Sequence, residues 1–134
     1  AKLDSLRKIN PNTKILVMGD LNDHPDNESV QNILGAKKEK SNLINLMWPI
    51  KEKNEGTHFY KGHWGVLDHI IVSSSLLEKN KGLSTKHEYV GVHKPEFLLY
   101  TNKKGVKSPS RTYGGKNYYG GFSDHLAIYL KLKK

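Results

Sequence analysis

The sequence predicts an α/β (α+β) fold, a β-sheet with flanking helices, and two kinds of pattern carry this prediction. Short apolar runs at 14–18 and 66–72 lie between turn-forming residues, which is typical of strands inside a sheet. Apolar residues recur at helical spacing at 1–9 and 26–34. A chain of 134 residues can bury one core and is too short for two domains. We therefore expect one domain.

The first part of the chain supplies the helices and the first strand. Residues 1–9 predict the last turns of a helix, which an Asn-Pro-Asn turn would end. The run 14–18 predicts a strand buried on both faces, and residues 26–34 predict a short capped helix. The apolar piece at 43–48 is compatible with either a short helix or a strand.

The rest of the sequence predicts mainly strands. We expect strands at 56–60, 66–72, 87–92, 97–100 and 126–132, a turn at 61–65, and a turn into a short helix at 73–77. In the last strand, alternate leucines and isoleucines from Leu126 would face the core. The segment Lys103 to Tyr119, rich in Gly, Ser, Lys and Tyr, predicts a long surface loop.

Charge and cysteine content limit the function. The net charge of +9 favours attraction to polyanions, but only Arg7 and Arg111 among the 22 cations are arginines. Lysine is a solvated point charge, whereas phosphate binding favours the arginine fork, so a solvated surface is preferred to a dedicated nucleic-acid groove. Because the chain has no cysteine, it can hold neither a disulfide nor a thiolate zinc site.

Asp68 is the most informative candidate, because its carboxylate lies within the apolar run 66–72. A buried charge is costly unless it is paired and hydrogen-bonded. His125, just before the last strand, is an attractive partner, since an aspartate that accepts from one imidazole nitrogen fixes the tautomer of the ring. The alternative is an ion pair between Asp68 and a nearby lysine. For Ser123-Asp124-His125, the alternative is an ordinary surface turn.

Asp20 and Asn22 follow the first strand with a spacing of two. In an extended segment this spacing places both side chains on one face, where the carboxylate could activate a water and the amide could hold an anionic oxygen. The alternative is an Asx turn that caps the next helix, and we prefer that interpretation for Asp23, His24 and Asp26. Asp124 offers an oxygen ligand suited to Mg²⁺. Together these groups suit hydrolysis of a phosphodiester or phosphomonoester.

Three motifs in this order resemble a known family. Gly19-Asp20-Leu21-Asn22, Leu67-Asp68-His69 and Ser123-Asp124-His125 are similar to the last three motifs of the endonuclease/exonuclease/phosphatase superfamily. That superfamily includes DNase I-like nucleases, exonuclease III-like repair enzymes, sphingomyelinases and inositol polyphosphate 5-phosphatases. The stretches around 62–68 and 111–125 look most like secreted members from Bacteroidetes-type bacteria, so a secreted or periplasmic location is implied by resemblance only.

The resemblance implies roles for five residues. Asp20 would activate the attacking water, Asn22 would hold the scissile phosphate, and Asp68 would orient His125, which would contact the phosphate in the transition state. Asp124 would contribute to a site for Mg²⁺ or Mn²⁺. The substrate would be a nucleic acid, a phospholipid head group or a sugar phosphate.

The resemblance also implies a four-layer DNase I-like sandwich, of which this chain would form one mixed sheet with its flanking helices. The early asparagine and metal-binding glutamate of the family have no counterpart here. We therefore expect residues 1–134 to be the C-terminal portion of one catalytic domain, with weak Mg²⁺ binding and little activity alone. An exposed sheet face would then bind the missing N-terminal half or self-associate. The alternatives are a noncatalytic polyanion-binding module on this scaffold and a structural domain with coincidental motifs.

Overall fold

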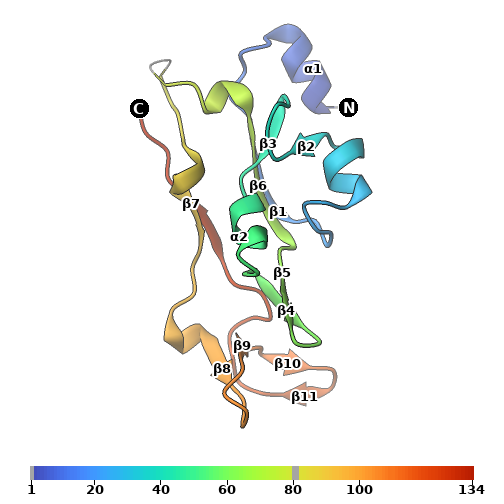
Figure 1. The fold of residues 1–134 in the computed structure, drawn as a ribbon, viewed down its shortest axis with the longest axis vertical. Coiled ribbons are helices and arrows are strands. Elements are labelled where there is room, and N and C mark those ends of the chain that lie inside the picture. The colour runs from blue at the N-terminus through green and yellow to red at the C-terminus, as the bar shows by residue number, and fades with distance from the viewer. Residues whose placement is uncertain (1, 80–81) are drawn as a thin grey trace.

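The computed structural model describes residues 2–79 and 82–134, and its centre is a mixed four-stranded sheet (Figure 1). The strands are β1 (Leu16–Asp20), β2 (Ala36–Lys37), β3 (Leu43–Asn45) and β6 (Asp68–Ser73), in the order β1-β6-β3-β2. β6 is antiparallel to both β1 and β3, whereas β2 is parallel to β3. This mixed sheet with its helices confirms the predicted α/β (α+β) class.

β6 organises the core because its side chains alternate between two apolar clusters. Ile70 and Val72 face one cluster, and Ile71 faces the other; all three are fully buried. The first cluster also contains Ile44, Leu46, Met47, Val66 and Leu76. The second contains Val30, Ala36 and Leu43, with Leu3, Val17 and Leu34 packed against it. A strand with apolar residues on both faces thus lies between two layers.

The helices are short. They are α1 (Lys2–Ile9), a π-helical turn at Ser29–Ile33 and α2 (Trp48–Glu52). The first prediction, 1–9, is confirmed except for residue 1, which lies outside the described residues. The second predicted helix, 26–34, began too early, because Asp23 binds the side chains of Asn27 and Ser29 and keeps the segment before Ser29 in a turn. The ambiguous piece at 43–48 is strand β3 followed by the start of α2.

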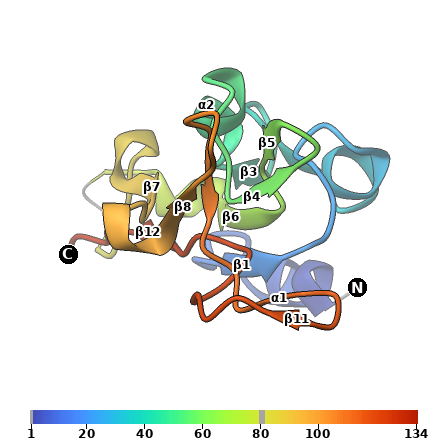
Figure 2. The ribbon, with the colours of Figure 1, turned by 90° about the horizontal axis from the view of Figure 1, so that it is seen from below.

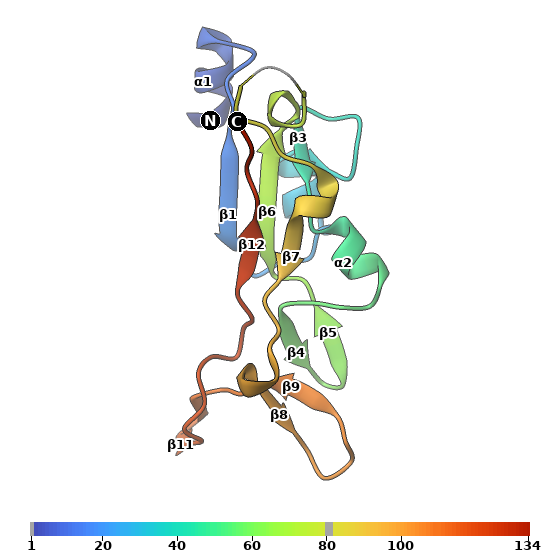
Figure 3. The same ribbon diagram turned by 90° about the vertical axis from the view of Figure 1, so that its left-hand side faces the viewer.

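The prediction that the first strand is buried on both faces is wrong. β1 lies at the edge of the sheet (Figure 3). Leu16 is 39% exposed and Met18 is 51% exposed, whereas Val17 packs against the second cluster. An apolar run shows that a strand suits burial, but it does not show which faces other segments cover.

The C-terminal strand forms a second layer. β12 (Ile128–Leu130) pairs antiparallel with β7 (Val90–Val92), and this pair packs on the Ile70 side of β6. Leu126 is buried, as predicted, but lies before the strand, and Leu132 lies after it and is 41% exposed. A 3₁₀ turn at His87–Tyr89 precedes β7, so only the second half of the predicted strand 87–92 is a strand. A 3₁₀ turn at Ser74–Leu76 follows β6, as expected.

Short hairpins form the end of the molecule opposite α1 (Figure 1), and Figure 2 views the molecule from this end. They are β4 (His58–Tyr60) with β5 (His63–Gly65), β8 (Leu99–Thr101) with β9 (Lys107–Pro109), and β10 (Tyr113–Gly114) with β11 (Asn117–Tyr118). A 3₁₀ turn at Glu96–Leu98 leads into β8. The expected loop at 103–119 is therefore wrong, because strands of two or three residues are too short to show a period. No helix among the described residues is long and apolar enough to cross a bilayer.

Candidate active site

Asp68 and His125 form the hydrogen bond that the sequence predicts. The Nδ1–H of His125 donates to Oδ2 of Asp68 over 2.7 Å, and the two side chains are 22% and 15% exposed. Asp68 is the first residue of β6, and His125 precedes the buried Leu126. An imidazole held in this way keeps its proton on Nδ1 and has Nε2 as the free ring nitrogen. No lysine pairs with Asp68 within the described part of the chain, so the alternative ion pair is not formed.

Thr57 ties these two segments together. Its side-chain oxygen accepts the backbone N–H groups of Leu67 and Asp68, each over 3.3 Å. Its carbonyl accepts the N–H of Leu126 over 2.8 Å. Thr57 is completely buried, whereas Leu67 and Asp68 are half-buried, so these bonds are partly shielded from water. One residue thus fixes the backbone beside both members of the Asp68–His125 pair.

Asp20 joins the pair from the neighbouring strand. It is the last residue of β1 and lies opposite Asp68 in the antiparallel register. Ligand atoms of Asp20, Asp68 and His125 all lie within 4.8 Å of one another. A cavity of about 360 Å³ opens here, lined by Met18, Gly19, Asp68, Ser123 and His125 among others. The end of β1 and the start of β6 thus bring Asp20 close to the Asp68–His125 pair.

Asn22 contacts Asp20 in a different way from the extended geometry that its spacing suggested. β1 ends at Asp20, and Asn22 has a φ of +54°, in the left-handed region. Its backbone N–H donates to Oδ1 of Asp20 over 2.8 Å, which is the Asx turn of the alternative interpretation. Its side-chain amide lies 3.5 Å from Oδ2 of Asp20. The extended spacing was wrong, but the carboxylate and carboxamide are still neighbours.

The loop after Asn22 is held by side-chain contacts, but the expected cap is wrong, because the helical turn at Ser29–Ile33 has no side-chain cap. Asp23 binds the side chains of Asn27 and Ser29, Asp26 pairs with Lys51 over 3.2 Å, and His24 Nδ1 lies 3.2 Å from the carbonyl oxygen of Val66. These contacts fix the loop that follows Asp20.

His69 also fixes that loop, and the sequence did not single it out as a candidate. The Asn45 amide donates to His69 Nδ1 over 2.8 Å, so Nε2–H donates to the carbonyl oxygen of Asp23, also over 2.8 Å. Burial lowers the pKa of His69, and the hydrogen bond to Asp23 opposes this only in part. The neutral ring is therefore the form that the fold holds.

Asp124 lies at the exposed side of the site. One carboxylate oxygen is 3.7 Å from Nη2 of Arg111, and the side chain is 53% exposed. Ser123 supports the next residue, because its Oγ accepts the N–H of His125 over 3.0 Å. Asp124 thus lies beside the Asp68–His125 pair without taking part in its hydrogen bond.

Two further residues at the site were missed from the sequence, His58 and Arg111. The rings of His58 and His125 have centroids 4.7 Å apart, and the two residues form an isolated β-bridge. Burial lowers the pKa of His58, and the neighbouring His125 lowers it further. His58 lies in a stretch that reads only as an edge strand, and nothing in the spacing of Arg111 pairs it with Asp124.

The side chains present suit a hydrated divalent cation only in part. Two groups place ligand atoms within 4.8 Å of one another among the described residues: Asp20, Asp68 and His125, and His58, Asp124 and His125. Mg²⁺ prefers oxygen ligands and keeps several waters, which suits the exposed carboxylate of Asp124. Arg111 competes for that carboxylate, and no glutamate joins either group within the described ranges.

Comparisons with known proteins agree with this geometry at the level of the family. No curated protein and no solved structure matches the chain significantly. The sequence profile of the Endonuclease/Exonuclease/phosphatase family matches residues 1–134. The chain therefore belongs to the Endonuclease/Exonuclease/phosphatase family and has the scaffold of a phosphate-ester hydrolase.

Proposed function

We propose that this chain carries catalytic residues of a metal-dependent phosphoesterase that hydrolyses a phosphodiester or phosphomonoester with an activated water. The observation that carries the proposal is the Asp68–His125 hydrogen bond of 2.7 Å beside the Asp20 carboxylate. An oriented imidazole next to a second carboxylate can hold a phosphate oxygen and deprotonate a water at one site. Family membership supports this chemistry.

In this mechanism Asp20 orients the water and takes its proton as the water oxygen attacks phosphorus. Its carboxylate is exposed and free of any lysine or arginine pair among the described residues. Asn22 offers an amide N–H to a phosphate oxygen, and the Asx turn holds that amide beside Asp20. His125 binds a phosphate oxygen through Nε2, while Asp68 stabilises the positive charge on the ring. The ester oxygen leaves as the bond to phosphorus breaks and takes a proton from solvent, to which Asp20 returns the proton that it accepted.

We propose Asp124 as the residue of this chain that holds Mg²⁺ or Mn²⁺. Its carboxylate is exposed and lies next to His125. A bound divalent cation would neutralise charge on the phosphate oxygens and strengthen the electrophilicity of phosphorus. Because no glutamate joins Asp124 among the described residues, we also propose that the principal carboxylate ligand comes from the N-terminal part of the family domain.

The same N-terminal part is our proposed cover for the exposed side of β1. Leu16 and Met18 present apolar surface there, and an exposed apolar sheet face favours association. We expect the isolated 134-residue chain to self-associate and to be nearly inactive. Light scattering that shows a monodisperse monomer without dye-accessible apolar surface would contradict this, as would robust Mg²⁺-dependent cleavage by the isolated chain.

The experiment that tests the proposed function compares variants of the full-length protein on bis-p-nitrophenyl phosphate with Mg²⁺. We expect His125→Ala and Asp20→Asn to abolish hydrolysis, and EDTA to abolish it in the unmodified protein. His93→Ala is the matched control, because His93 is exposed and, among the described residues, only its backbone N–H forms a hydrogen bond, with the carbonyl oxygen of Ala127. Hydrolysis that survives in both active-site variants would refute the proposal.

The second candidate is the noncatalytic polyanion-binding module, which the net charge of +9 favours. It predicts that the unmodified protein binds a DNA oligonucleotide but hydrolyses no phosphate ester under any metal condition. Under the proposed function, the His125→Ala variant keeps oligonucleotide binding and loses only hydrolysis.

A further inference from the structure

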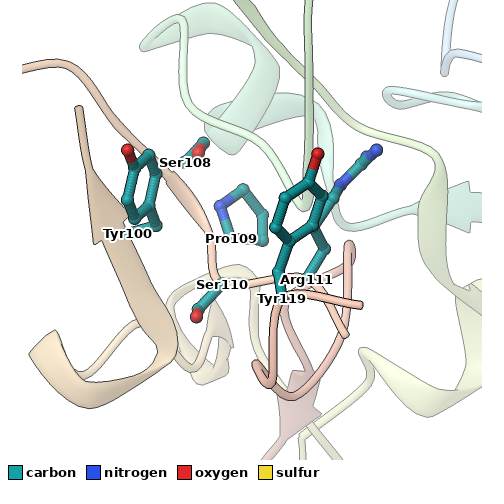
Figure 4. A pocket seen from close by; sticks show the side chains of 6 residues that line it. All are labelled: Tyr100, Ser108, Pro109, Ser110, Arg111 and Tyr119. Atoms are coloured by element: carbon teal, nitrogen blue, oxygen red, sulfur yellow. The ribbon is translucent and has the colours of Figure 1, made fainter. Parts of the chain in front are cut away.

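A second cavity lies between the β8–β9 and β10–β11 hairpins, and neither Asp68 nor His125 lines it. It measures about 400 Å³ and is lined by Tyr100, Ser108, Pro109, Ser110, Arg111 and Tyr119. Tyr100 and Tyr119 lie on opposite sides of Pro109, and Arg111 extends beside Tyr119 (Figure 4). The two tyrosines are 57% and 63% exposed, so their rings are available to a ligand. The size of the cavity suits a small organic group.

This cavity is tied directly to the segment that carries His125. The carbonyl oxygen of Ser110 accepts the N–H of Phe122 over 2.6 Å and the N–H of Ser123 over 3.2 Å. Arg111 approaches the Asp124 carboxylate to 3.7 Å. A ligand that fills the cavity would therefore touch the backbone and side chains next to the proposed phosphate site.

The ring of Tyr119 packs against Gly114, where a side chain would leave no room for it. A Cβ atom at Gly114 would lie 2.5 Å from Cε2 of Tyr119, so the ring packs directly on the glycine. The N–H of Tyr119 also donates to the carbonyl oxygen of Thr112 over 2.8 Å. The exposed ring is thus fixed before any ligand arrives, which lowers the entropic cost of binding.

The residues that line the cavity favour a nucleobase over a choline head group. Aromatic rings stack on any nucleobase, and an arginine can stack on a base or bind its phosphate. The hydroxyl groups of Ser108 and Ser110 can bond to polar edges of a base. The arginine cation disfavours a quaternary ammonium, so a choline head group fits this cavity poorly. Exposed Lys103, Lys104 and Lys116 on the hairpins add attraction for phosphates on either side.

We propose that this cavity binds an unpaired nucleobase of the substrate, next to the phosphate held at His125, so that the substrate is a single-stranded nucleic acid. Tyr119 provides the stacking surface, Arg111 binds the base or its phosphate, and Tyr100 closes the opposite side. This inference rests on the proposed function, because that function places the scissile phosphate beside Asp124. A base in a duplex is already stacked and could not enter the cavity without unpairing.

The test measures binding of the full-length protein to two fluorescent oligomers, with EDTA present so that the metal-dependent reaction cannot occur. One is an eight-residue oligothymidylate, and the other has the same backbone with abasic residues. We expect about tenfold tighter binding of the thymidylate in the unmodified protein. Tyr119→Ala and Tyr100→Ala should lose that preference, and Tyr119→Phe should keep it. Tyr113→Ala is the control, because Tyr113 is also exposed on the β10–β11 hairpin but does not line the cavity.

Three outcomes would overturn the inference. The first is equal binding of both oligomers by the unmodified protein. The second is an equal loss of the thymidylate preference in Tyr113→Ala and Tyr119→Ala. The third is a loss of binding to phosphatidylcholine vesicles in Tyr119→Ala while oligomer binding stays unchanged. If Tyr119→Ala fails to fold, Tyr119→Leu keeps apolar volume without an aromatic ring and should still lose the preference. Bis-p-nitrophenyl phosphate carries no base, so its hydrolysis without a thymidylate preference would refute this inference alone. A thymidylate preference without any hydrolysis of bis-p-nitrophenyl phosphate would instead refute the proposed function, but it would still support a base-binding site in this cavity.

Discussion

Thr57 holds the backbone of Asp68 from a neighbouring segment, through a 3.3 Å hydrogen bond from the Asp68 N–H to the threonine side chain. The carbonyl oxygen of Thr57 also accepts the N–H of Leu126, next to His125. The geometry of the Asp68–His125 pair therefore depends on a residue that carries no charge and is itself completely buried. Thr57 is a positioning residue, since it touches neither the proposed phosphate nor the water.

Thr57→Val should lower both stability and activity, because valine keeps the shape but removes the acceptor of two backbone N–H groups. Unsatisfied buried donors cost about 1–3 kcal/mol, and we expect a loss at the lower end because both bonds are long. Urea unfolding measures the stability. Thr57→Ser, which retains the hydroxyl, should recover most of kcat, and a Ser variant as impaired as the Val variant would contradict a role for the hydroxyl.

Asp68→Asn should keep the fold and remove most of the activity. The asparagine amide can present a donor to His125 Nδ1 in place of the carboxylate acceptor, which changes the tautomer of the ring. It also cannot stabilise the positive charge that the ring carries when Nε2–H donates to a phosphate oxygen. We expect a fall in kcat of about a hundredfold or more, with little change in KM. The ¹⁵N chemical shifts of the His125 ring would report the tautomer directly. An unchanged tautomer with full activity would show that Asp68 does not orient His125.

The sequence predicted the centre of this site because burial imposes strict requirements on a few residues. A carboxylate within an apolar strand needs a donor, and this requirement made His125 an attractive partner of Asp68, with a nearby lysine as the alternative. The pairing of β1 with β6 follows from no local pattern, yet it places Asp20 opposite Asp68. His58 and Arg111 reach the site only through tertiary contacts, the first by an isolated bridge and the second by an approach to Asp124 across the β10–β11 hairpin. Strands of two or three residues, such as β10 and β11, leave no period for sequence analysis to detect.

His69 should make the protein less stable as the pH falls below its ordinary pKa of 6.5. Burial lowers the pKa of His69 in the fold, so between the unfolded and folded pKa values the unfolded chain binds more protons. The stabilising contribution is complete above pH 6.5 and is lost as the pH falls through the folded pKa. His58, whose pKa is also lowered, acts in the same direction.

The measurement for His69 is the free energy of urea unfolding between pH 8 and pH 5. His69→Gln should be less stable than the unmodified protein at pH 8, because it disrupts the bonds to Asn45 and Asp23. Its stability should also fall less steeply with decreasing pH. His93→Gln is the control for the loss of an exposed histidine and should retain the original slope. Identical slopes in the unmodified and His69→Gln proteins would contradict the assignment.

Asp124→Asn should raise the Mg²⁺ concentration needed for half-maximal activity of the full-length protein. The carboxylate would contribute charge to the ion, whereas the neutral amide leaves Arg111 without its anionic neighbour at 3.7 Å. We expect an increase of about tenfold, with kcat at saturating Mg²⁺ changed much less, because the other proposed ligands remain. Asp26→Asn is the control, since Asp26 is also exposed and paired, with Lys51, but lies in the loop after Asn22. Equal Mg²⁺ titrations for the Asp124→Asn and Asp26→Asn variants would exclude Asp124 from the metal site. A higher Mg²⁺ requirement in Asp124→Asn alone would support direct ligation, because both variants remove one negative charge from the protein.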